Sequence, residues 1–334
     1  MRLSEGVSGS RILALGEYSP ARVVPNEEIC ARLDSSDEWI RTRSGIVTRR
    51  IAGPDETVVD MAQRAGHNAM CAAGLASEDI DLVIVATSSL PYQTPGAAAE
   101  VAHRIGITAP GAMDITAGCA GFCYALAVAS DAVRIGNSAC ALVIGSERPS
   151  DMVDPDDRSM AFLFGDGAGA AIVGRSEEPG IGPVVWGSDG SKVEAIAQRP
   201  TFAQLRAEVM AGGRAVLPMV RMDGVAVFRW ATAEVARVAA RALDAAGVAP
   251  HELGAFVPHQ ANLRIIESVA RALKLPKSVA IARDIVDRGN TSTASIPLAL
   301  HGMLERGEVK SGEPALFVGF GAGLTYAGQV ALIP

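Results

Sequence analysis

Two apolar runs decide the fold: ALVIG at positions 141–145 and ALFVG at positions 315–319, roughly 170 residues later in the chain. Both runs are apolar at successive positions and end in glycine. A strand of this kind is buried on both faces, which is typical of a mostly parallel sheet covered by helices. The repeated run therefore predicts an α/β chain built from two similar halves.

Other landmarks repeat at nearly the same spacing. A helical pattern that ends in Ala-Gly occurs over residues 58–74 and again over residues 235–247, and an apolar run follows each one. An Asp-Ile pair occurs at 114–115 and at 284–285, and we interpret both pairs as strands that lead into a helix. Landmarks in the same order predict two halves related by a pseudo-twofold axis, in a five-layered αβαβα architecture.

The boundary between the halves is expected near residues 174–182, after the last strand of the first half. This gives an N-terminal half over residues 1–178 and a C-terminal half over residues 179–334. Residues 191–220 have no counterpart in the first half, so they are predicted to form an insertion.

Composition excludes several classes of function. The net charge of −7 argues against nucleic-acid binding, which needs a basic surface. The first ten residues have no apolar core of a signal peptide, and no run reaches the ~20 apolar residues needed to cross a membrane. Five cysteines, an odd number in apolar contexts, do not indicate a disulfide framework. We therefore expect a cytoplasmic protein that contacts neither nucleic acid nor membrane.

Cys119 is the first candidate catalytic residue. It lies among Ala and Gly residues in the sequence AGCAGF (117–122), just before a helical pattern. A helix N-terminus favours a thiolate, so a lowered pKa is expected for this thiol, and the small neighbours would let a carbonyl approach the sulfur. A buried structural cysteine is the alternative interpretation of this position alone.

His259 and Asn290 are the second and third candidates. His259 ends an apolar strand, where α/β sheets commonly place their sites, and Asn290 precedes a helix in the position equivalent to the Cys119 turn. Alone, the histidine could be a hydrogen-bonded residue at a strand end and the asparagine an N-cap. The pseudo-twofold axis would bring the Cys119 and Asn290 turns together at the centre of the molecule.

A Cys/His/Asn set without a carboxylate to orient the histidine fits condensation better than hydrolysis. Cys119 would carry an acyl group as a thioester, which implies ping-pong kinetics. His259 and Asn290 would donate hydrogen bonds to a thioester oxygen while a malonyl carboxylate leaves as CO₂. The backbone N–H of Cys119 and one N–H from the turn GFGAG (319–323) are candidates for an oxyanion hole.

The chain resembles the β-ketoacyl-acyl-carrier-protein synthase III family of the thiolase superfamily from about residue 10 to its last residue. The segments that carry the resemblance are SSDEWI (35–40), AGCAGF (117–122), GDGAGA (165–170), PHQANLRII (258–266), GNTS (289–292) and GFGAG (319–323). It implies a thiolase-like fold and a condensation of an acyl-CoA primer with malonyl-acyl-carrier protein, without a metal or other cofactor. Gly118, often Ala in the family, and Ala322 are small departures.

The resemblance also implies roles for further residues. Phe320 would form a wall of the site near Cys119, and the Ala322 N–H would complete the oxyanion hole. Trp39 and Arg158 would flank the adenine of coenzyme A, and Arg43 would lie near its phosphates. Arginine suits the phosphate role because its planar guanidinium makes paired hydrogen bonds.

Two surfaces are implied by the same resemblance. Gln93 and Thr94 would cross the interface of a homodimer to the partner's primer pocket, and their modest size would admit a branched primer. A basic face on and after the helix that follows His259 would dock the acidic carrier protein; this face consists of Arg264, Arg271, Lys274 and Lys277.

Several alternatives are open or excluded at this point. The same machinery would serve as a starter-unit ketosynthase of a polyketide pathway, and a non-catalytic carrier-binding relative is the alternative from another class. A degradative thiolase needs a second catalytic cysteine near the C-terminus, whereas the last cysteine is Cys140. His67, His103, His251 and His301 lie in polar or helical contexts without the spacing of metal ligands, so no metal site is expected.

Overall fold

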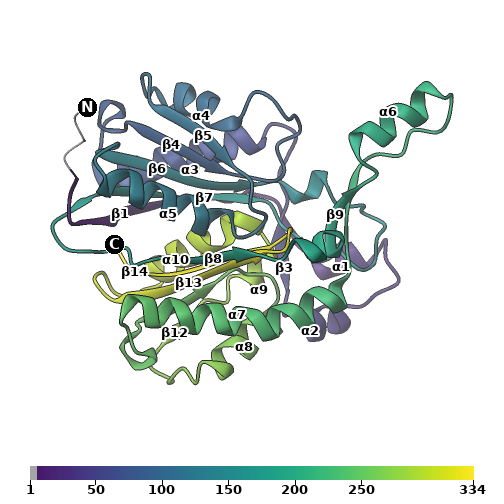
Figure 1. The fold of residues 1–334 in the computed structure, drawn as a ribbon. Coiled ribbons are helices and arrows are strands. Elements are labelled where there is room, and N and C mark those ends of the chain that lie inside the picture. Colours follow the sequence, from purple (N-terminus) through teal and green to yellow (C-terminus); the bar gives the residue numbers. More distant parts are fainter. Residues whose placement is uncertain (1–5) are drawn as a thin grey trace.

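The structure, a computed structural model, describes residues 6–334, and two five-stranded sheets form its centre (Figure 1). The first sheet has the order β1 (Gly9–Tyr18), β7 (Gly167–Ser176), β6 (Cys140–Glu147), β4 (Leu82–Ala86) and β5 (Gly111–Ile115). The second sheet has the order β12 (Ala280–Ile281), β11 (Ala255–Pro258), β13 (Pro314–Gly321), β14 (Thr325–Leu332) and β8 (Val185–Ser188). The two repeated apolar runs, in β6 and β13, lie in the central strands, so the predicted duplication is confirmed.

Both sheets are mixed rather than mostly parallel. In the first, β4 is parallel to β5 and β6, whereas β7 is antiparallel to β6 and β1. In the second, β11 is parallel to β12 and β13, whereas β14 is antiparallel to β13 and β8. Three residues connect β13 to β14, and so short a connection joins only antiparallel strands. The strands are therefore buried on both faces because helices cover each sheet on both sides, whatever the direction of the strands.

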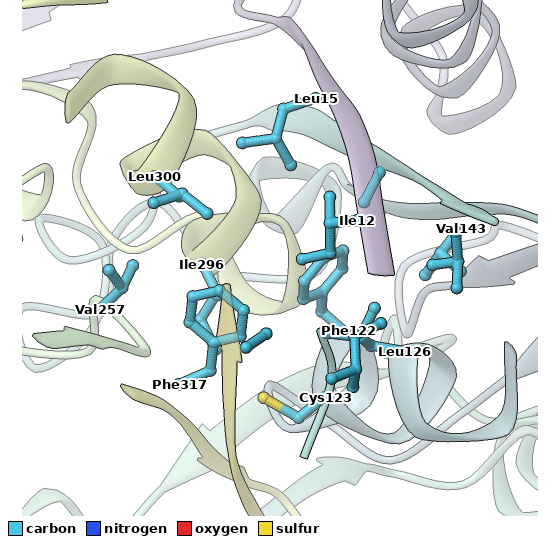
Figure 2. Close-up of a cluster of buried hydrophobic side chains, with 14 of the residues drawn as sticks. Ile12, Leu15, Phe122, Cys123, Leu126, Val143, Val257, Ile296, Leu300 and Phe317 are labelled. Carbon is cyan, nitrogen blue, oxygen red and sulfur yellow. The ribbon is translucent and has the colours of Figure 1, made fainter. Parts of the chain in front are cut away.

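Helices form the other three layers, which confirms the five-layered prediction. The helices α3 (Val58–Ala73) and α4 (Ala97–Ile105) cover the outer face of the first sheet, and α7 (Gly224–Ala246) and α8 (Leu263–Ala272) cover that of the second. Between the sheets lie α5 (Gly121–Arg134) and α10 (Ser295–Glu305). Their buried side chains, Phe122 and Ile296 among them, pack with Phe317 of β13 (Figure 2).

Local sequence signals account for several helix ends. The Thr57 hydroxyl accepts the N–H of Asp60, and the Thr57 N–H donates to the Asp60 carboxylate, a reciprocal cap that begins α3. Gly74 ends the same helix with φ +65°, a conformation that glycine adopts without strain. The helix α7 begins at Gly224, earlier than the predicted residue 235, because the Asp223 carboxylate accepts the N–H groups of Val225 and Ala226.

The interpretation of residues 284–285 as a strand was wrong. The strand is β12, and Asp284 precedes the short helix α9 (Ile285–Arg288). The Asp284 carboxylate is buried and lies 3.5 Å from the Arg288 guanidinium, one helical turn later. This i,i+4 ion pair favours a helical turn, which a strand pattern does not reveal.

The predicted insertion leaves the layered body. It contains β9 (Ile196–Arg199) and β10 (Met219–Met222), which pair with each other, and α6 (Phe202–Met210) at the end of a projecting arm (Figure 1). A second small unit consists of β2 (Val23–Pro25), α1 (Asn26–Cys30), α2 (Asp37–Ser44) and β3 (Thr48–Arg50), and its two strands pair with each other. Short 3₁₀ turns occur at Ser77–Asp79, Pro149–Asp151, Gly190–Ala195, Pro250–Glu252 and Ser292–Ala294.

The division at residue 178 lies in the connection between β7 and β8, which belong to different sheets. The central core takes side chains from both halves, so the division into two separate units stays a prediction. Among residues 6–334, no helix is long and apolar enough to cross a bilayer.

Candidate active site

One cavity of about 1360 Å³ brings together Cys119, His259 and Asn290. His259 directly follows β11, Cys119 lies in the turn before α5, and Asn290 lies in the turn before α10. His259 and Asn290 are buried, and Cys119 is half-buried. The meeting of the two helix starts agrees with the predicted pseudo-twofold axis.

The Cys119 turn packs against the turn after β13. Gly118 has φ +52°, and a Cβ at this position would lie 2.7 Å from the Ala322 nitrogen. A Cβ on Gly321 would lie 2.4 Å from the Cys119 nitrogen. Two glycines therefore allow the Cys119 turn to pack closely against the backbone of residues 321–322. Ala322 does not have a positive φ, so its backbone is unstrained.

The prediction of a lowered pKa for Cys119 was wrong. Burial raises the pKa of the Cys119 thiol to about 12, and the negative charge of Glu147 acts in the same direction, against a hydrogen bond with Ser292. The helix start alone does not overcome the loss of hydration, because a thiolate is poorly stabilised away from water. The resting thiol is therefore protonated at neutral pH.

The His259 ring is neutral and held on two sides. Its Nδ1 lies 2.8 Å from Ser295 Oγ, and its edge packs on Phe320, with ring centroids 5.2 Å apart. Burial lowers the pKa of His259 to about 3, against a hydrogen bond with the Ser292 backbone. At neutral pH the ring therefore presents an uncharged N–H or N atom to the cavity and no positive charge.

Asn290 is oriented by its own turn. Its Oδ1 accepts the Ser292 N–H at 2.8 Å, which leaves the amide NH₂ to donate into the cavity. Its backbone is fixed by two hydrogen bonds, from its own N–H to the Leu163 carbonyl and from the Gly165 N–H to its carbonyl. Gly165 fits only without a side chain, because a Cβ would lie 2.1 Å from the Arg288 carbonyl oxygen. Gly165 thus supports the site by close packing.

Comparison with known proteins shows the family of this chain. Residues 113–190 match the family described as 3-oxoacyl-[acyl-carrier-protein] synthase III, and residues 243–333 match its C-terminal region. A β-ketoacyl-[acyl-carrier-protein] synthase III of Streptomyces coelicolor is 51% identical over 99% of this chain and 98% of its own length. The chain belongs to this family.

Solved structures of the synthase III family share the fold. The priming β-ketosynthase from the R1128 polyketide biosynthetic pathway has a TM-score of 0.96 and 48% identity, and the alignment covers 100% of this chain and 98% of the other. The 3-oxoacyl-[acyl-carrier-protein] synthase III of Aquifex aeolicus has a TM-score of 0.87 and 38% identity, over 98% and 100% of the two chains. The expectations of a thiolase-like fold and of a condensing acyltransferase are thereby confirmed.

The residues that the resemblance assigned to coenzyme A lie together in this synthase III chain. Trp39, Arg43 and Arg158 line the same cavity as Cys119. The Arg158 guanidinium is 5.3 Å and the Arg43 guanidinium 6.0 Å from the centre of the Trp39 ring, and Phe162 packs edge-on against that ring at 5.2 Å. An aromatic face with two cations beside it suits a planar base that carries phosphates.

The other two predicted surfaces lie outside the catalytic centre. Gln93 and Thr94 are exposed in the loop after β4 and do not line the cavity of their own chain. Arg264, at the start of α8, lines the cavity and packs on Phe228, 5.1 Å from the ring centre. The remaining basic residues are exposed at the far end of α8 or after it; these are Arg271, Lys274 and Lys277.

Sequence reasoning missed three polar residues of this site. Ser292 and Ser295 hold Asn290 and His259, and Glu147 hydrogen bonds with Ser292. The sequence does contain one indication of Glu147. This residue ends the apolar strand β6, so its carboxylate was to be expected in the interior of the protein. In the described part of the chain, no group of His, Cys, Asp and Glu side chains is arranged to hold a metal ion.

Proposed function

We propose that this protein joins an acyl-CoA primer to malonyl-acyl-carrier protein by decarboxylative Claisen condensation. The products are a 3-oxoacyl-carrier protein, CoA and CO₂, and the reaction would initiate fatty-acid synthesis. The observation that carries the proposal is the meeting of Cys119, His259 and Asn290 in one cavity that extends to Trp39 and Arg158. The names of the similar proteins, which are β-ketoacyl-carrier-protein synthases III, support it.

In the first half-reaction, the Cys119 sulfur attacks the thioester carbonyl of the primer. The bond between the carbonyl carbon and the CoA sulfur breaks, and the acyl group stays on Cys119. The tetrahedral intermediate carries a negative oxygen, which the N–H groups of Cys119 and Ala322 would stabilise. The close packing of the two glycine turns that carry these residues supports this assignment.

In the second half-reaction, a malonyl thioester enters the same site. Its carboxylate leaves as CO₂, and the electron pair forms an enolate whose oxygen accepts hydrogen bonds from His259 and Asn290. The enolate carbon then attacks the Cys119 thioester and releases the thiolate. A neutral His259 suits this role, because a donor N–H stabilises the oxyanion without a charge that must be buried. Phe320 would hold the ring in place.

The experiment that tests this function is intact-mass spectrometry after incubation with a panel of acyl-CoAs, followed by addition of malonyl-carrier protein. An acyl adduct that disappears as a 3-oxoacyl product forms would support the proposal. An absence of adduct with every acyl-CoA would exclude CoA priming.

The cavity mouth gives a prediction about CoA binding. Trp39→Ala or Arg158→Ala should raise the KM for acyl-CoA by roughly tenfold, because each removes one side of an aromatic and cationic contact. The KM for an acyl-pantetheine, which lacks the adenine nucleotide, should not change. Trp186→Ala is the control, since Trp186 is exposed and packs on Tyr124 away from the cavity. Equal losses with both acyl donors would contradict the assignment.

A polyketide starter role is the second candidate, and one observation favours it. The R1128 priming β-ketosynthase is similar to this chain over its full length at 48% identity. Both roles use the same chemistry at Cys119 and differ in the primer. Acceptance of longer or branched primers in the panel would favour this second role.

We also propose a homodimer whose primer pockets are completed by Gln93 and Thr94 of the opposite subunit. The strand β5 lies at the edge of the first sheet, and its Met113 side chain is exposed. Gln93 and Thr94 are also exposed, in the stretch of chain between β4 and β5. An exposed sheet edge offers unpaired backbone groups to a second chain. Sedimentation of the protein should give twice the mass of one chain.

The modest size of Gln93 and Thr94 predicts that branched primers are accepted. In an extension assay with malonyl-carrier protein, kcat/KM for isobutyryl-CoA should equal or exceed that for acetyl-CoA. Gln93→Phe should reverse the order by about tenfold, because a larger side chain would fill the space of a branched methyl group. A clear acetyl preference of the unmodified protein would rule out the wide pocket.

The carrier protein would dock on the basic residues that begin with Arg264 at the cavity mouth. Carrier proteins are acidic, so positive charge near the entrance would steer their approach despite the net charge of −7. Arg271, Lys274 and Lys277 would extend this surface along and beyond α8. We place the protein in the cytoplasm, where acyl-CoA and carrier protein are present, and propose no cofactor.

A further inference from the structure

Ser292 connects the candidate nucleophile to a buried carboxylate. Its Oγ lies 2.8 Å from Glu147 Oε1 and 3.3 Å from Cys119 Sγ. Ser292 has φ +51°, a left-handed conformation that is uncommon for residues other than glycine. Because its backbone N–H also orients Asn290, the turn holds one hydroxyl between the thiol and the carboxylate.

Glu147 is almost fully enclosed, with 1% of its surface exposed. Its Oε2 accepts hydrogen bonds from the Ser88 N–H at 3.1 Å and from the hydroxyls of Ser89 and Thr87. None of the ion pairs found among residues 6–334 includes it. Burial raises the pKa of Glu147 above its ordinary value, against these hydrogen bonds. A buried carboxylate with only neutral donors around it takes up a proton at lower cost than one beside a cation.

The direction of the hydrogen bonds follows from counting protons. A serine hydroxyl has one hydrogen to donate and lone pairs to accept with. The carboxylate is the nearer and the stronger acceptor, so Ser292 donates to Glu147. Ser292 Oγ is then free to accept the S–H of Cys119, which completes a chain from thiol to hydroxyl to carboxylate.

We infer that Ser292 and Glu147 form a proton relay that activates Cys119. As the sulfur bonds to the primer carbonyl carbon, its proton passes to Ser292 Oγ, and the Ser292 proton passes to Glu147 Oε1. When the bond to the CoA sulfur breaks, the leaving thiolate takes up a proton from Ser292. Glu147 then returns its proton to Ser292 and is ionised again. Ser292 touches the reacting sulfur and is catalytic, and Glu147 is a positioning residue that acts through it.

The relay explains how a thiol with a pKa of about 12 reacts at neutral pH. Without a base, only a minute fraction of Cys119 would be thiolate. His259 is a poor proton acceptor at neutral pH, because burial lowers its pKa to about 3, and the hydrogen bond of the Cys119 sulfur is with Ser292. The groups packed against Glu147 are the three hydroxyls and the Ser88 N–H already named, and Cys119 is the titratable group across Ser292.

This inference rests on the proposed role of Cys119 as nucleophile, and its test does not need an acyl donor. The rate of alkylation of Cys119 by iodoacetamide is measured from pH 5 to pH 10 by intact mass. In the unmodified protein the rate should level off once Glu147 is ionised. In Glu147→Gln it should fall by about a hundredfold at pH 7, a usual contribution of a general base, and then rise tenfold per pH unit.

Asp166→Asn is the matched control. Asp166 is equally buried and also accepts hydrogen bonds from backbone N–H and serine hydroxyl groups, but it does not contact Cys119. Ser292→Gly provides a second variant, because glycine tolerates φ +51° while the hydroxyl is lost. It should reproduce the Glu147→Gln profile, and the double variant should be no slower than either single one.

Three outcomes separate the inference from the proposed function. A Glu147→Gln profile equal to that of the unmodified protein would overturn the relay. Equal losses in Asp166→Asn would show a merely structural effect and would overturn it as well. If alkylation shows the relay but no acyl-CoA loads Cys119, the relay stands and CoA priming fails.

Discussion

Cys119→Ala is expected to abolish acyl loading and to lower kcat/KM for condensation by about 10⁴-fold or more, as loss of a covalent nucleophile does in other enzymes. Alanine removes the only atom that holds the acyl group between the two half-reactions. Alanine and glycine already surround this position, and the change leaves the two glycine turns in place, so the fold should be kept. Intact-mass spectrometry with acyl-CoA measures the loading, and product formation from malonyl-carrier protein measures the condensation.

Cys123→Ala is the control for this prediction. Cys123 is fully buried in the first turn of α5, and burial raises its pKa to about 12, as it does for Cys119. Its sulfur faces Gly319 of β13 and lies outside the set of residues that line the cavity. The Cys123→Ala protein should load normally. An acyl adduct on Cys119→Ala that vanishes only when Cys123 is also replaced would show that the wrong thiol was chosen.

The fold was largely predictable because its evidence is local and repeated. The runs that became β6 and β13 have a hydrophobic pattern that needs no partner to be recognised, and the helix that ends at Gly74 carries both of its end signals in the sequence. Strand direction was not predictable in this way. Burial on both faces is the same for parallel and antiparallel strands inside a layered structure, so the mixed sheets were missed.

The three central residues of the site could be predicted, but their electrostatics could not. Cys119 and Asn290 were brought together by the duplication, which is a feature of the sequence. The pKa of Cys119 depends on how much protein surrounds the sulfur and on Glu147, which is 28 residues away in the chain. Hydrogen bonds between Ser292, Glu147 and Cys119 join three separate segments, and no spacing rule in one sequence reveals them.

Asn290→Ala and His259→Ala are expected to stop condensation while acyl loading continues. Each removes one donor to the enolate oxygen, and loss of one such donor usually lowers kcat by about 10²–10³-fold. The two half-reactions are measured separately. Intact mass measures the loading of Cys119 with acyl-CoA, and CO₂ release from malonyl-carrier protein measures the decarboxylation. Loss of both steps in either variant would show that the residue supports the fold of the site and not the second half-reaction.

The neutral state of His259 adds a pH dependence with a definite sign. Because burial lowers the pKa of the folded-state ring to about 3, the folded protein does not take up this proton between pH 6.5 and pH 3, whereas the unfolded chain does. The free energy of unfolding should therefore fall as the pH drops through this window, and His259→Ala should remove that part of the fall. Between pH 6.5 and pH 9 the decarboxylation rate should show no step from His259. A step in that range that His259→Ala eliminates would mean that the ring is protonated during the reaction and donates as a cation.

Asn290→Asp tests the donor role of the Asn290 amide. The variant keeps the acceptor for the Ser292 N–H but replaces the NH₂ donor by a carboxylate oxygen. It should therefore decarboxylate malonyl-carrier protein no faster than Asn290→Ala does.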